Sequence, residues 1–184
     1  MKLLLDSTNE NKLRELRAAL PDWEIGLVGA PDEPVEDGST FLENARIKAW
    51  HGREHAPADA WVAGEDSGIE VDALGGRPGV HSARWAADGV AQLLAELGAS
   101  TDRRARYVSE LVVLAPDGSE LRARGTLEGE IAEAPRGDEG FGYDPVLVPL
   151  GESSTVAELG NAWKSRNSHR ARAARALAEM LAER

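Results

Sequence analysis

The spacing of apolar residues predicts alternating strands and helices in the first half of the chain. An apolar run from Lys2 to Asp6 predicts a strand, and leucines then recur at helical spacing from Leu13 to Leu20. The Ser-Thr-Asn stretch at 7–9 supplies a cap for this helix, and Pro21 ends it.

A second helix and a buried strand follow. A capping-box pattern at 39–43 opens the helix, which is expected to fade near Gly52 or Pro57. The run Trp61–Ala63 predicts a strand that enters the polar, glycine-containing segment 64–68 and gives way there. A carboxylate in that segment could therefore leave the core and enter a cleft.

The second half of the chain mixes helical and β patterns. Its expected elements are a helix over 90–97, an antiparallel hairpin over 106–128 with one face in water, a glycine-rich loop over 137–144, a short strand over 145–149 and a final helix from residue 168. No repeat interrupts this order, so the sequence predicts a mixed α/β fold.

Length and composition favour a single intracellular domain. A chain of 184 residues with 42% hydrophobic content can bury one sizeable core, and no Pro/Gly/Ser-rich linker divides it. No apolar run is long enough to span a bilayer, and the apolar start turns polar too soon for a secretory signal. We therefore expect one domain over residues 1–184, in the cytoplasm, with no membrane partner.

Charge and cysteine usage restrict the chemistry. A formal net charge of −11 argues against nucleic acid as a partner, since binding its backbone needs a basic surface. The absence of cysteine excludes thiol catalysis and cysteine-ligated zinc. An anionic ligand would therefore need a local cluster of cations or a divalent metal.

The segment from Ser7 to Lys12 has the character of a phosphate site. Helix amino termini attract phosphate through backbone N–H groups and the helix dipole, and a lysine one turn in adds a positive charge. The alternative is a capped surface helix with a solvated lysine.

The acidic pair Glu65-Asp66 is a candidate metal and catalytic site. Paired carboxylates suit a hard divalent cation, which keeps waters that can attack a phosphate. An acidic turn is the plainer alternative. Glu33, Glu36 and Asp37, in the loop before the second helix, could complete the metal site or could form an exposed acidic loop.

Two further segments could contact a nucleotide. In Gly140–Asp144 two aromatic residues stand between glycines, which lets backbone approach a flat ligand while a ring stacks on it; a tight turn with both rings in the core is the alternative. Lys164, His169 and Arg170 surround Ser168 at a predicted helix start, where cations oppose the helix dipole and so suggest an anion or a base edge.

One motif is expected to carry no catalysis. His51-Gly52-Arg53-Glu54-His55 matches the H-x-x-E-H pattern of a zinc peptidase family. Gly52 weakens the helix that would have to hold the two histidines, and Pro57 soon ends it. Two surface histidines at a fraying helix end are expected instead.

Five segments together resemble one known family. They are STNENKLREL at 7–16, STFLENARIKA at 39–49, EDSGIEVDALGGRPGVHSARWA at 65–86, GFGYDPV at 140–146 and KSRNSHRARA at 164–173. In this order they resemble the inosine triphosphate pyrophosphatase family, also called RdgB/HAM1-like. The resemblance implies an elongated mixed sheet flanked by helices, two lobes with a central nucleotide cleft, and a homodimer.

The resemblance also implies an activity and a site. It implies Mg²⁺-dependent cleavage of inosine- or xanthosine-type purine nucleoside triphosphates to monophosphate and pyrophosphate, with Asp66 as the metal-linked catalytic group. The implied contacts to substrate are Ser7, Thr8, Asn9, Glu10, Asn11, Lys12, Ser67, Phe141, Gly142, Tyr143, Asp144, Lys164, His169 and Arg170.

Departures from the family pattern limit this transfer. Asn11 stands where the family often has glycine, and Asn167 replaces an apolar residue. Val35-Glu36-Asp37 replaces a Glu-Glu pair, so Glu36 is the expected second metal carboxylate but its neighbours stay open. Two alternatives remain for the function: a Maf-like pyrophosphatase acting on pyrimidine or modified nucleotides, and a nucleotide sensor without catalysis.

Overall fold

The chain folds around one mixed sheet in the order that the sequence predicts. The structure is a computed structural model, and it describes residues 2–182. Its elements are β1 (Lys2–Asp6), α1 (Glu10–Ala19), β2 (Glu24–Leu27), α2 (Phe41–His55), β3 (Trp61–Val71), the 3₁₀ turns η1 (Asp72–Leu74) and η2 (Gly79–His81), α3 (Gly89–Leu97), β4 (Arg104–Leu114), β5 (Glu120–Ile131), β6 (Leu147–Pro149), α4 (Val156–Asn167) and α5 (His169–Ala182). Within these described residues, no helix is both long and apolar enough to cross a membrane.

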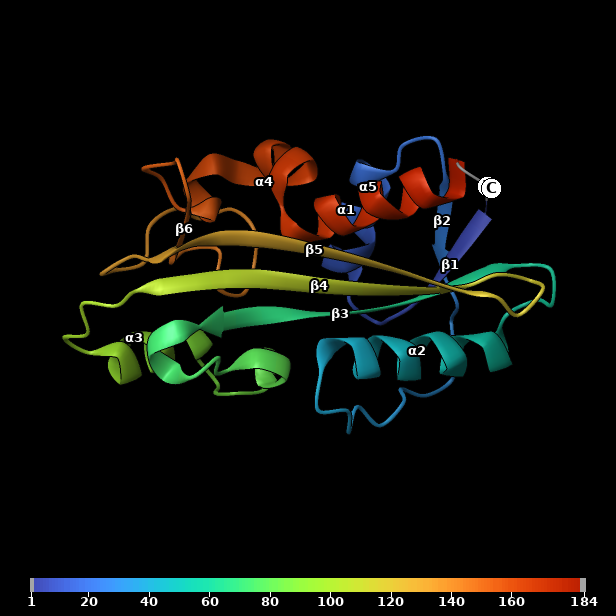
Figure 1. Ribbon diagram of the computed structural model, residues 1–184, viewed down its shortest axis with the longest axis horizontal. Coiled ribbons are helices and arrows are strands. Elements are labelled where there is room, and N and C mark those ends of the chain that lie inside the picture. Colours follow the sequence, from blue (N-terminus) through green and yellow to red (C-terminus); the bar gives the residue numbers. More distant parts are fainter. Residues whose placement is uncertain (1, 183–184) are drawn as a thin grey trace.

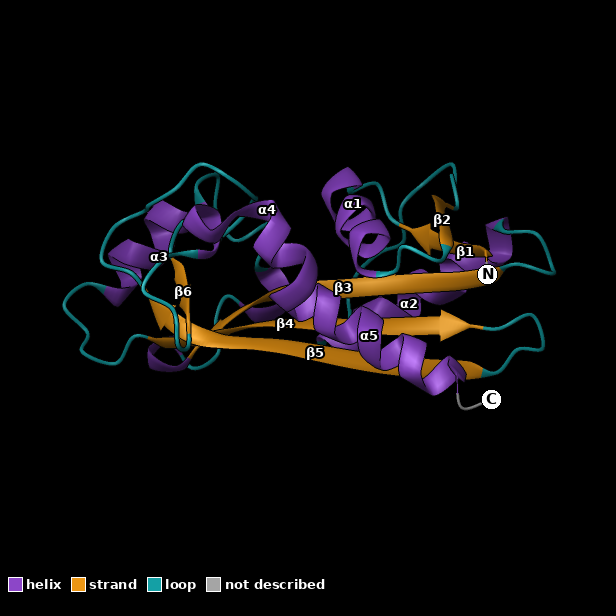
Figure 2. Ribbon diagram, turned by 90° about the horizontal axis from the view of Figure 1, so that it is seen from above, coloured by secondary structure: helices purple, strands orange, loops and turns teal. Residues whose placement is uncertain are grey.

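The sheet is elongated because three of its strands are long. Its six strands lie in the order β2-β1-β3-β4-β5-β6. β1 pairs in parallel with β2 and β3, and all later pairs are antiparallel. Helices α1, α4 and α5 lie on one face of the sheet, and α2 and α3 lie on the other (Figure 1). Seen from above, β3, β4 and β5 run along the whole molecule (Figure 2).

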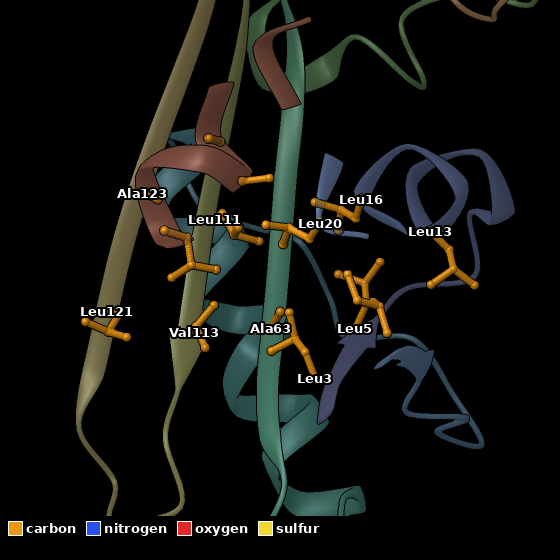
Figure 3. Packing of buried hydrophobic residues seen from close by; sticks show 14 residues of the cluster. Leu3, Leu5, Leu13, Leu16, Leu20, Ala63, Leu111, Val113, Leu121 and Ala123 are labelled. Atoms are coloured by element: carbon orange, nitrogen blue, oxygen red, sulfur yellow. The ribbon is translucent and has the colours of Figure 1, made fainter. Parts of the chain in front are cut away.

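Of the three apolar clusters among the described residues, the two larger ones lie along these strands, one in each lobe. The first joins α1, β1, β2 and α5 to one half of the long strands, through residues such as Leu5, Leu16 and Leu177 (Figure 3). The second joins α3, β6 and the start of α4 to the other half, through residues such as Leu93 and Leu147. The predicted two-lobed α/β architecture is confirmed, and the lobes share one sheet.

Helix starts follow the predicted capping chemistry. The Asn9 side chain caps α1, and Thr40 with Glu43 forms the predicted capping box of α2. α2 ends at His55, between the two residues expected to stop it. The predicted hairpin is β4–β5; β5 has one exposed face, whereas β4 is buried along nearly all its length because α2 and α5 both pack on it.

The predicted end of the strand at residues 64–68 is wrong. β3 continues without interruption to Val71, paired with β4 over its length. Gly64 and Gly68 lie where another segment packs closely against the β3 backbone, and not in turns. A Cβ on Gly64 would lie 2.1 Å from the Ala45 carbonyl oxygen of α2, and one on Gly68 would lie 2.3 Å from Ser82 Oγ. Each glycine therefore lets another segment reach the strand backbone.

Among the α-helices and strands of the described residues, β2 and α4 were not predicted. β2 is only four residues long, contains Gly26 and lacks the alternation that identifies a strand. α4 is broken by Gly160, which has a φ of 80°, so no regular helical spacing runs through it. The one available signal was the Thr155–Glu158 capping box at its start.

Two more glycines set how closely helices approach the sheet. Gly52 of α2 faces β1 and β3, since a Cβ there would lie 2.7 Å from Asp6 Cβ. Gly125 of β5 faces the first turn of α5, since a Cβ there would lie 2.0 Å from the His169 carbonyl oxygen. At Gly125 the α5 backbone therefore packs directly on β5, and at Gly52 the α2 backbone packs directly on strand side chains.

We expect Gly64→Ala to destabilise the fold strongly. The added methyl would overlap the Ala45 carbonyl oxygen and the Ala49 amide nitrogen, at 2.1 and 2.3 Å, and backbone cannot rotate away. The cost should be about 3 kcal/mol, at the upper end for overpacking, measured by urea unfolding.

Gly26→Ala is the matched control for this change. Gly26 also lies in a strand, but a Cβ there meets only Leu4 Cδ2, at 3.4 Å. Its free energy of unfolding should stay within about 0.5 kcal/mol of the parent value. Equal stability of the two variants would show that α2 does not press on β3 as described.

Candidate active site

A large cavity lies where β1 ends and leaves an edge of β3 open. The last β1–β3 pair is Asp6 with Gly64, and the next backbone pairing of β3 away from β4 is the isolated bridge between Glu70 and Pro78. Beside the open edge lies a cavity of about 580 Å³. This volume is within the range typical of small-molecule sites.

The cavity brings nearly all the predicted site residues together. Its lining includes Ser7, Thr8, Asn9, Glu10, Lys12, Glu36, Asp66, Ser67, Phe141, Gly142, Tyr143, Asp144, Lys164, His169 and Arg170. Among the substrate contacts that the family resemblance implies, Asn11 does not line it. Residues more than a hundred positions apart in the chain therefore share one space.

The amino terminus of α1 meets the cavity with its first amides already capped. Asn9 Oδ1 accepts hydrogen bonds from the N–H groups of Asn11 and Lys12, at 3.0 and 3.3 Å. Ser7 Oγ accepts one from the Asn9 N–H at 3.0 Å. Thr8 Oγ1 donates to Glu33 of the acidic loop. The loop and the helix start are thus linked across the cavity mouth.

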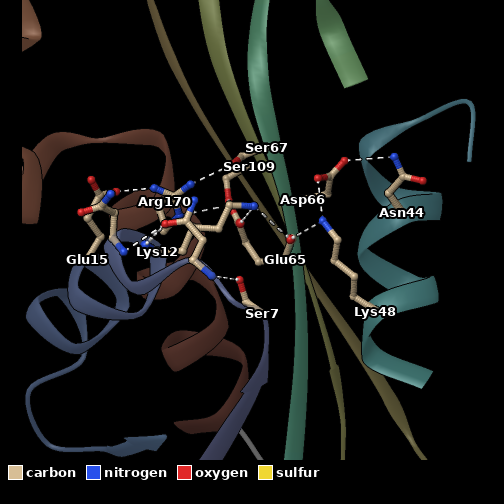
Figure 4. Close-up of polar contacts among 12 residues, drawn as sticks. Ser7, Lys12, Glu15, Asn44, Lys48, Glu65, Asp66, Ser67, Ser109 and Arg170 are labelled. Atoms are coloured by element: carbon tan, nitrogen blue, oxygen red, sulfur yellow. Dashed lines mark hydrogen bonds and ion pairs between the residues drawn. The ribbon is translucent and has the colours of Figure 1, made fainter. Parts of the chain in front are cut away.

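Glu65 and Asp66 do not act as a pair, which corrects the expectation of two carboxylates on one cation. They are neighbours inside β3, and successive strand side chains point to opposite faces of the sheet. Glu65 points toward α1 and α5, and Asp66 points toward α2 (Figure 4). Only Asp66 lines the cavity.

On the α2 side, two side chains hold the Asp66 carboxylate. Asp66 Oδ1 accepts from Lys48 Nζ at 2.9 Å, and Oδ2 accepts from Asn44 Nδ2 at 3.2 Å. Lys48 Nζ also contacts Glu36 Oε1 at 2.8 Å. Burial raises the pKa of Asp66 above its usual value, although the positive charge of Lys48 opposes this. A higher proton affinity suits a general base.

On the opposite face, Glu65 is fully buried and paired. Its carboxylate contacts Lys12 Nζ at 2.8 Å and Arg170 Nε at 3.1 Å, and it accepts from Ser109 Oγ at 2.8 Å. Burial favours the neutral acid, but Arg170 and Lys12 outweigh it and hold the pKa of Glu65 well below its usual range. Glu65 is therefore a permanent anion that orients two cations.

The same buried network continues through Glu15 of α1. Glu15 contacts Arg170 through one oxygen and Lys164 Nζ through the other, the latter at 2.6 Å. Lys164 Nζ also contacts Asp144 Oδ2 at 2.6 Å. Asp144 in turn accepts from the Tyr107 hydroxyl at 3.2 Å. Ion pairs therefore link α1, β3, α4 and α5 beneath the cavity.

The two aromatic residues of the glycine-rich loop have different surroundings. Tyr143 packs in the second core and donates its hydroxyl hydrogen to the Ser82 carbonyl at 3.0 Å. Phe141 is only partly buried, and Lys164 Nζ lies 4.5 Å from its ring centroid. Both rings line the cavity, and Phe141 is the more exposed of the two.

The cations near the carboxyl end of the chain belong to two helices, which corrects the expectation of one helix start. Lys164 lies in the last turn of α4, where its charge favours the helix dipole. His169 and Arg170 open α5, whose first turn is capped by Ser168 Oγ accepting from the Ala171 N–H at 3.2 Å.

Sequence reasoning missed Lys48 and Glu15 as site residues. Both are charged residues on buried helix faces: Lys48 lies beside Ala45 and Ala49 in α2, and Glu15 lies beside Leu16 in α1. A charge on an apolar helix face must be paired or lie in a polar site. That mismatch was the signal that could have identified them.

Comparisons with a family model and with similar proteins all indicate the same family. A model of the Ham1 family matches residues 3–180. A dITP/XTP pyrophosphatase of Symbiobacterium thermophilum is 48% identical over 181 residues, covering 94% of this chain and 90% of that protein. A dITP/XTP pyrophosphatase of Methylococcus capsulatus is 45% identical over 195 residues, covering 98% and 96%.

Solved structures agree in fold. The Ham1 protein of Staphylococcus aureus superimposes with a TM-score of 0.87 at 34% identity, covering all of both chains. A nucleoside-triphosphatase, dITP/XTP pyrophosphatase of Mycobacterium abscessus gives a TM-score of 0.76 at 41% identity, covering 98% of this chain and 100% of that one. With a family match over nearly the whole chain, this protein belongs to the Ham1 family.

Proposed function

We propose that this protein hydrolyses inosine- and xanthosine-type nucleoside triphosphates to the monophosphate and pyrophosphate. Family membership and the names of the relatives, dITP/XTP pyrophosphatases, support this activity. The proposal includes a homodimer in the cytoplasm, as the family resemblance implies. The biological result would be removal of deaminated purine nucleotides from the nucleotide pool.

One observation carries the assignment of roles to residues. Asp66 lines the same cavity as Lys12 and Lys164, although the three side chains come from β3, α1 and α4. A triphosphate in this cavity would meet a carboxylate at one end and ammonium groups along its length. Phosphoryl transfer depends mainly on such positioning and electrostatics.

The residues present fit a divalent cation. Glu36 and Asp66 both place an oxygen within 2.9 Å of the Lys48 ammonium, so two carboxylates converge on a single positive charge. Carboxylate oxygens are the ligands that Mg²⁺ prefers. We therefore assign Glu36 and Asp66 as its protein ligands. Bound Mg²⁺ would neutralise phosphate charge and increase the acidity of a bound water.

Asp66 is the proposed general base. Its carboxylate would take a proton from a water whose oxygen attacks the α-phosphorus, while the bond from that phosphorus to the bridging oxygen breaks and pyrophosphate leaves. Lys12 and Lys164 would stabilise the charge on the departing pyrophosphate. Their carboxylate partners Glu65, Glu15 and Asp144 hold both ammonium groups in place beforehand.

Purine choice is assigned to His169 and Arg170. The His169 ring stacks on Tyr107, with centroids 4.5 Å apart, and its Nδ1 is buried without a hydrogen-bond partner among the described residues. A polar base edge would satisfy that atom. The Arg170 guanidinium only donates hydrogen bonds, so it suits a 6-oxo group and not the amino group of adenine.

The two alternatives are less well supported. Nothing in the family match favours a Maf-like enzyme for pyrimidine nucleotides. A sensor without catalysis would not need Asp66, with its raised pKa, beside Lys48 and Glu36. Pyrophosphate release in the presence of Mg²⁺, compared between purine and pyrimidine nucleoside triphosphates, separates all three hypotheses.

We expect pyrophosphate release from ITP, dITP and XTP, and far less from ATP, dTTP and UTP. Asp66→Asn should lower turnover on ITP by about 10²- to 10⁴-fold, the usual contribution of a general base. The amide is nearly isosteric, so the thermal midpoint should change little. Turnover is measured as pyrophosphate release with excess Mg²⁺.

Each part of this result can fail separately. A preference for dTTP or UTP would support the Maf-like alternative. No hydrolysis of any nucleotide by the folded parent protein would support the sensor. Wild-type turnover by folded Asp66→Asn protein would remove Asp66 from its role while leaving the substrate class intact.

We expect Glu36→Gln to raise the Mg²⁺ concentration needed for half-maximal turnover by about tenfold. The change removes one of the two carboxylates that converge on Lys48. Asp37→Asn is the matched control, because Asp37 is exposed and does not line the cavity. The Mg²⁺ concentration for half-maximal turnover is measured for both variants. If it rises in Asp37→Asn and not in Glu36→Gln, Asp37 is the metal ligand in place of Glu36.

We expect His169 to make the fold acid-sensitive. Burial, reinforced by Arg170, holds the pKa of His169 well below its usual value, so the folded protein keeps the neutral ring. Below about pH 6.5 the unfolded chain binds a proton that the folded chain does not. Stability should therefore fall on acidification, by up to about 1.4 kcal/mol per pH unit from this residue.

His169→Gln isolates this contribution, since glutamine does not titrate. Urea unfolding of both proteins from pH 7.5 to 5 should show the steeper acid loss in the parent protein, because all other groups are common to both. Parallel curves for the two proteins would mean that His169 is not kept neutral by the fold.

A further inference from the structure

A cluster of metal-ligating side chains lies at the carboxyl-terminal end of α2, outside the proposed Mg²⁺ ligands. His51 and His55 are one helical turn apart, so both rings project from the same side of α2. Their ring centroids lie 4.8 Å apart. Asp32, from the loop that follows β2, reaches the same point.

The three ligand atoms already lie near the spacing of a zinc site. His51 Nε2 and His55 Nε2 lie 3.3 and 3.9 Å from Asp32 Oδ1, and all three atoms lie within 4.8 Å of one another. In a tetrahedral site with bonds of 2.0–2.1 Å, neighbouring ligand atoms are about 3.3 Å apart. Asp32 and His55 have exposed side chains that can close this gap by small rotations.

His51 also has the outer partner that metal-bound histidines use. Its Nδ1 contacts Oδ2 of Asp6, a buried carboxylate, at 2.8 Å. A carboxylate on one ring nitrogen fixes the tautomer, directs the other nitrogen at the metal and raises its basicity. The contact of Asp6 with Nδ1 therefore directs Nε2 of His51 toward Asp32. The expectation of two surface histidines is wrong for His51, which is partly buried.

Gly52 builds this geometry instead of weakening it. The helix continues through Gly52 to His55, and the glycine is buried against β1 and β3. The lack of a side chain lets α2 lie close to Asp6, which brings His51 within hydrogen-bond distance. Gly52 was expected to loosen the helix, but tertiary packing decides its role.

We propose that Asp32, His51 and His55 bind Zn²⁺, with water completing the coordination. Two imidazole nitrogens and one carboxylate are a ligand set typical of zinc, whereas Mg²⁺ prefers oxygen ligands alone. This site differs in chemistry from the pair Glu36 and Asp66. Bound zinc would fasten the loop after β2, which also carries Glu33 and Glu36, to the end of α2.

Zinc binding by the tag-free protein, in the presence of excess Mg²⁺, tests the proposal. Calorimetry with Zn²⁺ should show one equivalent bound, and Co²⁺ used as a probe should give the intense visible absorption of a tetrahedral site. His55→Ala and Asp32→Asn should each weaken Zn²⁺ binding by at least about tenfold. Both residues are exposed, so neither change should unfold the protein.

Two control variants make the outcome decisive. His81→Ala removes another exposed histidine and should bind Zn²⁺ as the parent does. Glu36→Gln removes a proposed Mg²⁺ ligand and should also leave Zn²⁺ binding unchanged. Equal affinity of the parent and His55→Ala proteins would overturn the proposal. So would loss of Zn²⁺ binding in Glu36→Gln alone, or no binding by the parent.

Discussion

The ion pair between Glu65 and Arg170 is the interaction on which the rest of the structure depends. Both side chains are almost completely buried, and together with Glu15, Lys12 and Lys164 they form a continuous network under the cavity. An isolated charge in that position would cost many kilocalories per mole, so each member requires the others. Removing one partner of a buried pair typically destabilises a protein by about 3–5 kcal/mol. Buried ion pairs therefore hold α1, β3, α4 and α5 together under the cavity, in addition to apolar packing.

The position of the cavity follows from the sheet. β1 stops at Asp6, and the β3 edge beyond Gly64 has side chains in place of a strand: Lys12 and Lys48 both donate to the Glu65 carbonyl, at 3.4 and 3.3 Å. Because that edge is open, groups on opposite faces of the sheet reach one space. Asp66 approaches from the α2 face, and Lys12 and Arg170 approach from the other. A strand pairing that continued further would have separated them.

Sequence patterns predicted local structure well and contacts across the fold poorly. The caps of α1 and α2 depend on residues two or three positions apart, so Asn9, Thr40 and Glu43 could be identified directly. Gly64 in β3 was interpreted as the end of the strand, but it is glycine because α2 packs against the strand backbone there. A contact with a distant helix leaves no local sequence pattern. Lys48 and Glu15 were missed for the same reason, since their partners lie far along the chain. The residues assigned to the site came mainly from family resemblance, and the cavity brings all but Asn11 together.

Gly125 does not line the cavity, yet it sets how closely the first turn of α5 packs on β5. Because α5 touches the β5 backbone there, its first turn is held where Arg170 meets Glu65. Any side chain at this position would lift that turn and the guanidinium with it. Substitutions that abolish activity should therefore occur not only at residues that contact the nucleotide but also at positions such as Gly125, where a helix packs against the sheet.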